Sequence, residues 1–188
     1  MPQDLPSGIN PRGDRRSRRF VLAVECIFNQ NARINGAAAW PAMNLELVRI
    51  CERHGAGIVQ IRCPEMHCLG WARKTAPGVW LREAMEREPA LGKLHELAAS
   101  VAEQTQDYLA NGYRPMAVLG ANPRSPGCAV HHEGDGLAAN SGVFILCLAE
   151  EFRRRGLEIP FRGIRDCDPK LMTEDLEWLE ALLTKEQK

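Results

Sequence analysis

The chain has 188 residues, a length typical of one domain, and 45% of them are hydrophobic, enough for a core. Its 24 Lys and Arg balance 24 Asp and Glu, so its charge gives no reason to expect a nucleic acid polymer or an anionic membrane as a partner. No run approaches the roughly 20 apolar residues of a membrane span. We expect positions 1–19, which are rich in arginine and lack an apolar signal segment, to form a disordered basic arm. Positions 20–188 are expected to form a single α/β domain.

Short apolar runs predict β-strands, and longer stretches with apolar residues at helical spacing separate them. The predicted strands are 20–24, 57–62, 116–120 and 159–164. The predicted helices are 44–54, 79–88, 90–111, 143–155 and 173–185. This alternation predicts an open, mostly parallel four-stranded sheet with helices on both faces, a three-layer fold of Rossmann or flavodoxin-like type.

The seven cysteines are odd in number and irregularly spaced, which argues against the disulfide framework of a small secreted protein. We therefore expect a reducing compartment, the cytoplasm. Cys51 and Cys147 lie on predicted helices among apolar neighbours and are expected to fill the core. Cys167 follows the fourth strand between two aspartates, which favours an exposed thiol.

Three other cysteines follow predicted strands. Cys26 comes directly after the first strand, Cys63 ends the second just before Pro64, and Cys128 lies a short loop beyond the third. Proline has no N–H for the next ladder bond, so we expect Pro64 to end its strand. Ligands of such sheets bind beyond the carboxyl ends of the strands. The three thiols are therefore expected to meet at one edge.

Three thiolates at one edge suit a metal centre with an open position. Four would complete a tetrahedral zinc site or fully ligate an iron–sulfur cluster. On a 4Fe–4S cluster, three leave one iron free to act as a Lewis acid, and a soft iron favours sulfur. The spacing alone fits three unrelated thiols equally well.

Three segments around these cysteines resemble the signature segments of a known family. They are Cys26–Asn29 with Arg33 and Gly36, Cys63–Glu65 with Leu69 and Gly70, and Ser125–Cys128. In this order they resemble the thiouracil desulfidase family, including a desulfidase branch formerly described as a domain of unknown function. Gly127 and Ala129 stand where that family has serine and glycine.

The resemblance implies a doubly wound α/β fold and a 4Fe–4S cluster held by Cys26, Cys63 and Cys128, with one iron not ligated by protein. It also implies an enzyme that hydrolyses a thiocarbonyl to the carbonyl and releases sulfide. The substrate would be a small thiolated molecule: a nucleobase, a nucleoside or a similar thioamide.

Two polar residues near these cysteines are candidates for catalysis. Glu65 lies two residues beyond Cys63 and suits general acid–base work, although it could instead cap a helix or pair with Arg62 or Arg73. Ser125 could donate a hydrogen bond to the substrate or to the cluster, or it could be a turn hydroxyl before a proline.

Candidates for substrate binding lie on the adjoining loops. Asn29 and Arg33 could offer donors to a heterocycle, with a self-bonded polar turn as the alternative, and Trp71 could stack on a planar ring. His131 and His132 could transfer protons, supply a fourth ligand, or be merely solvated.

Two other functions remain open at this point. Cys63, Cys68 and Cys128 with a histidine could bind zinc, although paired Cys-x-x-Cys motifs are absent. The chain could also be a non-catalytic sensor that binds a cluster. It has neither a Gly-x-Gly-x-x-Gly motif after the first strand nor a Walker loop, so a bound dinucleotide is not expected. The oligomeric state is left open.

Overall fold

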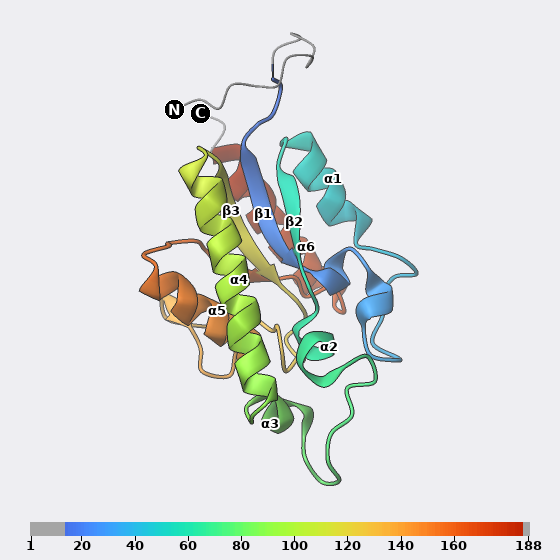
Figure 1. The fold of residues 1–188 in the computed structure, drawn as a ribbon. Coiled ribbons are helices and arrows are strands. Elements are labelled where there is room, and N and C mark those ends of the chain that lie inside the picture. Colours follow the sequence, from blue (N-terminus) through green and yellow to red (C-terminus); the bar gives the residue numbers. More distant parts are fainter. Residues whose placement is uncertain (1–13, 186–188) are drawn as a thin grey trace, which may run out of the picture.

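The computed structural model describes residues 14–185, which form a parallel sheet between layers of helices (Figure 1). The four strands run in the order β2-β1-β3-β6 and are all parallel. Their bounds are Arg19–Val24 for β1, Gly57–Ile61 for β2, Arg114–Gly120 for β3 and Phe161–Gly163 for β6. The predicted α/β fold class is confirmed.

The register of the sheet brings the ends of three strands to the same level. Val24 of β1 pairs with Ile61 of β2, and Ala23 of β1 pairs with Leu119 of β3. After their first residues, β1 and β3 are apolar and buried because helices cover both faces of the sheet at its centre. After β1 the chain forms β2 on one side of it, and later β3 on its other side. The switch in strand order, where such sheets bind ligands, therefore lies at β1.

Two pairs of helices cover the sheet. α4 (Ala90–Ala110) packs with α5 (Val143–Arg154), and α1 (Leu45–Arg53) packs with α6 (Pro169–Lys185). Figure 1 shows α4 in front of the sheet and α6 behind it, so each pair covers one face. Each helix buries an apolar stripe at helical spacing, as Leu94, Ala98 and Val101 do in α4.

Among residues 14–185, one α-helix was not predicted by the sequence analysis. Pro64 ends the second strand as expected, but it also begins α2 (Pro64–Leu69), with Cys63 as the N-cap residue. Proline is favoured at the first helical position because the N–H that it lacks would have no partner there. α2 lies at the end of the sheet where the strands finish (Figure 1).

Other element bounds also differ from the prediction. The helix predicted at 79–88 shortens to α3 (Leu81–Met85), and the last helix begins at Pro169, earlier than the predicted 173. It begins early because the side chain of Asp168 accepts hydrogen bonds from two backbone N–H groups of its first turn. The predicted loop at 131–141 contains a small antiparallel pair, β4 (His132–Glu133) and β5 (Gly136–Leu137).

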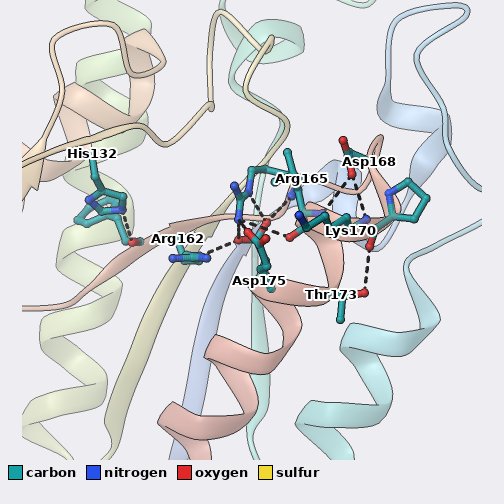
Figure 2. A network of polar contacts seen from close by, with 11 residues as sticks. His132, Arg162, Arg165, Asp168, Lys170, Thr173 and Asp175 are labelled. Atoms are coloured by element: carbon teal, nitrogen blue, oxygen red, sulfur yellow. Dashed lines mark hydrogen bonds and ion pairs between the residues drawn. The ribbon is translucent and has the colours of Figure 1, made fainter.

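A buried carboxylate joins the edge strand β6 to α6 (Figure 2). Asp175 has a fully buried side chain and accepts hydrogen bonds from Arg162 at 2.8 Å and from Arg165 at 2.6 and 2.8 Å. It also accepts from the backbone N–H of Arg165 at 2.9 Å. Charge-assisted bonds of this kind are among the strongest in proteins. They fix the segment that continues into Asp166 and Cys167.

Most of the expected N-terminal arm lies outside the described residues. Within its described part, Arg16 pairs with Asp14 and donates a hydrogen bond to the hydroxyl of Tyr113, and Arg19 begins β1. Between residues 14 and 185, no helix combines the length and apolar character required to cross a membrane.

Candidate active site

Three cysteines from three separate loops line one cavity of about 580 Å³. Cys26 lies in the 3₁₀ helix η1 (Glu25–Ile27) directly after β1, Cys63 precedes α2, and Cys128 lies on the loop after β3. All three are buried, and their thiols are free of disulfides. The structure thus brings the predicted cysteines together at the carboxyl ends of the strands.

The thiols interact with one another. The neighbouring thiol of Cys128 lowers the pKa of Cys26, and the thiol of Cys26 together with burial raises the pKa of Cys128 well above its ordinary value. Burial raises the pKa of Cys63, and the negative charge of Glu65 raises it further. The positive charge of Arg33 also lowers the pKa of Cys26.

The cysteines do not form a site for a single ion. Among residues 14–185, no three His, Cys, Asp or Glu side chains are grouped so that they could hold one metal ion. The ligands of an iron–sulfur cluster are arranged differently, because each cysteine binds a different iron and the cysteine sulfurs lie around the whole cluster. Three soft thiol donors that line a common cavity match the donor set of such a cluster.

Glu65 enters the cavity from α2 and is held in place by two partners. Its carboxylate, in a residue that is 8% exposed, forms an ion pair with Arg73 at 2.9 Å and accepts a hydrogen bond from the Ser125 hydroxyl at 3.0 Å. The Ser125 oxygen accepts from the backbone N–H of Cys128 at 3.2 Å and lies 3.1 Å from the sulfur of Cys128. The predicted catalytic pair and one cysteine therefore form a connected network.

Small residues let the Cys128 loop approach its neighbours closely. A side chain at Gly127 would place its Cβ 3.1 Å from Glu65 and 3.2 Å from Pro64. A Cβ at Gly142 would lie 2.4 Å from the backbone nitrogen of Cys128. The glycine at 127, where the resembling family has serine, thus allows α2 to carry Glu65 against this loop.

A buried aspartate that sequence reasoning did not select organises the other side of the cavity. Asp166 has a fully buried side chain and forms a 2.7 Å ion pair with Arg33. It also accepts hydrogen bonds from Gln30 at 3.3 Å and from Asn122 at 3.0 Å. The available signal was its position after the fourth strand, since all parallel strands end at the same edge.

Other predicted residues lie elsewhere. Neither Asn29 nor Trp71 lines the cavity, and the Trp71 side chain is 71% exposed. Asn29 accepts a hydrogen bond from Asn31 at 3.1 Å, as the alternative of a self-bonded turn requires. His131 and His132 each bond a backbone carbonyl oxygen, those of Pro123 and Phe161, and neither lines the cavity. Arg33 is the one predicted substrate-binding residue that does line it.

Cys51, Cys147 and Cys167 have the environments predicted for them, whereas none was predicted for Cys68. Cys51 and Cys147 are buried in helices, and burial raises the pKa of Cys51 to about 12. Cys68 is buried in α2 outside the cavity lining, and its pKa is raised to about 11 for the same reason. Cys167 is exposed and lines the cavity, so it reaches the same edge as the other three.

No protein-family model, curated protein or solved structure matches this chain. We therefore infer a function from the cavity and its residues. They combine three thiols, a buried carboxylate in a hydrogen-bonded network, and two buried arginines.

Proposed function

We propose that this protein is an iron–sulfur-dependent desulfidase that hydrolyses a thiocarbonyl to the corresponding carbonyl and releases sulfide. The observation that carries the proposal is that three free, buried thiols from separate loops share one cavity with a carboxylate. The resemblance of the segments that carry them to thiouracil desulfidases supports the same conclusion. Because such clusters need free thiols, we also propose that the protein acts in the cytoplasm.

The cofactor in this proposal is a 4Fe–4S cluster held by Cys26, Cys63 and Cys128. When bound, it would supply one iron without a protein ligand as a Lewis acid for the soft sulfur of a thiocarbonyl. The donor set fits, because all three side chains are thiols, which are the usual protein ligands of such clusters.

Glu65 has the position expected of a general base. It takes one proton from the attacking water as the new carbon–oxygen bond forms and gives it to the sulfur when the carbon–sulfur bond breaks; the second water proton leaves the hydroxyl as the carbonyl forms and completes the hydrogen sulfide. The overall balance is one thiocarbonyl and one water giving one carbonyl and one hydrogen sulfide. Arg73 and Ser125 fix both carboxylate oxygens and so orient Glu65 toward the cavity.

The substrate in this proposal is a small thioamide with an N–H group. A cavity of about 580 Å³ is within the usual range for small-molecule sites. Asn122 lines it, and its amide nitrogen faces Asp166, which has only acceptor oxygens, so the orientation of the amide is fixed. Its Oδ1 atom is buried without a hydrogen-bond partner among the described residues, and we assign it the N–H of the substrate.

Anaerobic purification with iron and sulfide quantitation tests the proposal first. We expect about four irons per chain and the broad visible absorption of a cluster, both lost in Cys26→Ala, Cys63→Ala and Cys128→Ala. Cys51→Ala is the matched control, because it removes a buried thiol outside the cavity and should leave the iron content unchanged.

Release of sulfide from 4-thiouracil, with uracil as the second product, tests the activity. A cluster without sulfide release from any thiolated base would contradict the enzyme and favour a cluster-binding sensor. A colourless protein that contains zinc and no iron would contradict both and favour a zinc protein.

A further inference from the structure

Two buried arginines lie beside two of the three cysteines, and each is paired with a buried carboxylate. Arg73 donates through Nε to Glu65 at 2.9 Å, and its Nη2 lies 3.6 Å from the sulfur of Cys63. Arg33 pairs with Asp166 at 2.7 Å and lines the same cavity as Cys26, and its positive charge is one of the causes that lower the pKa of Cys26. Two buried guanidinium–carboxylate pairs, on loops that follow different strands, therefore lie at the cavity beside these cysteines.

Both guanidinium groups are tightly held. Arg73 has a φ of 46°, in the left-handed region that is unfavourable for a residue with a side chain. Its guanidinium also donates to the backbone oxygens of Trp71 and Ala32. The side chains of Arg73 and Arg33 are only 5% and 6% exposed. A buried arginine stays charged, so both positive charges are permanent.

The third cysteine has a different environment. Cys128 lies 3.1 Å from the neutral hydroxyl of Ser125, and it has no hydrogen bond to a guanidinium in the described part of the chain. Of the Arg73–Glu65 pair, the guanidinium is the group that contacts the sulfur of Cys63, at 3.6 Å, and the charges of Glu65 and Asp166 oppose those of the arginines at the two thiols. Three cysteine thiolates would therefore meet positive charge at two of the three ligand positions.

We propose that Arg33 and Arg73 are positioning residues that hold permanent positive charge against the Cys26 and Cys63 sulfurs and thereby raise the reduction potential of the bound cluster. This inference depends on the cluster of the proposed function. Hydrogen bonds and positive charge at ligand sulfurs stabilise the more negative, reduced state of a cluster. Asp166 and Glu65 keep the two guanidinium groups in place.

The test is the reduction potential of the anaerobic, cluster-loaded full chain, measured by spectroelectrochemical titration without substrate. We expect Arg33→Gln and Arg73→Gln each to shift the potential to more negative values, and Arg73→Lys to recover part of that shift. Arg124→Gln is the control, because Arg124 lines the same cavity, is exposed and has no ion-pair partner among residues 14–185. The reduction potential of the Arg124→Gln variant should equal that of the wild type.

Equal potentials in the wild type and both glutamine variants would overturn the inference, as would a wild-type chain that binds no cluster. If one glutamine variant fails to fold, the other decides, and a potential equal to that of the wild type in that variant would again overturn the proposal. Sulfide release is measured separately. Shifted potentials without sulfide release would refute only the enzyme, whereas sulfide release with unshifted potentials would refute only the role of the arginines.

Discussion

Replacing Glu65 by glutamine separates the chemical role of the carboxylate from its structural role. The substitution keeps the shape of a residue that is 8% exposed, but it removes the charge and the ability to take a proton. The amide oxygen can still accept from Arg73, and the amide nitrogen can donate to the oxygen of Ser125, so both contacts of the carboxylate have a substitute. We therefore expect the cavity to keep its arrangement.

Glu65→Gln should affect stability and catalysis to different extents. Loss of the charge opposite Arg73 should lower the free energy of unfolding by about 1.5–3 kcal/mol, the range for a hydrogen bond to a charged group. Loss of general base catalysis should lower kcat by a factor of about 10²–10⁴. Denaturant unfolding and the rate of sulfide release measure the two effects independently.

A matched control is Glu96→Gln on the exposed face of α4, which should change neither quantity. The iron content of Glu65→Gln should equal that of the wild type, because the cysteines are untouched. A kcat within twofold of the wild type, with the cluster intact, would remove Glu65 from the mechanism.

Other predictions follow from the same cavity. Gly142→Ala places a Cβ 2.4 Å from the backbone nitrogen of Cys128, so we expect the free energy of unfolding, measured with denaturant, to fall by about 1–3 kcal/mol. A free energy equal to that of the wild type would contradict the close contact between these two loops. In the native chain, an alkylating reagent at about pH 8 should modify Cys167, which is exposed, and spare Cys51, whose pKa of about 12 keeps it protonated; mass spectrometry of peptides distinguishes them. Methylation of the N–H beside the thiocarbonyl of 4-thiouracil should weaken its binding to the wild type about tenfold or more, as measured by calorimetry. Asn122→Ala should bind the methylated and unmethylated compounds equally. Equal affinities of the wild type for the two compounds would refute the assigned contact.

The amino-acid sequence determined the fold class and the meeting of the cysteines. Continuous apolar runs separated by helical stretches predict a parallel sheet, and the carboxyl ends of parallel strands lie at one edge. Cys26, Cys63 and Cys128 each follow a strand, so their common location follows from topology alone.

Only the tertiary structure decided which polar groups surround the three cysteines. Arg33 and Asp166 are 133 residues apart in the chain, and Glu65 and Ser125 are 60 apart, so no local pattern connects them. Trp71 and Arg73 lie two positions apart on one loop, yet the indole is exposed and the guanidinium is buried beside Cys63. Arg73 also has a φ of 46°, a left-handed conformation that local sequence preferences do not specify for an arginine.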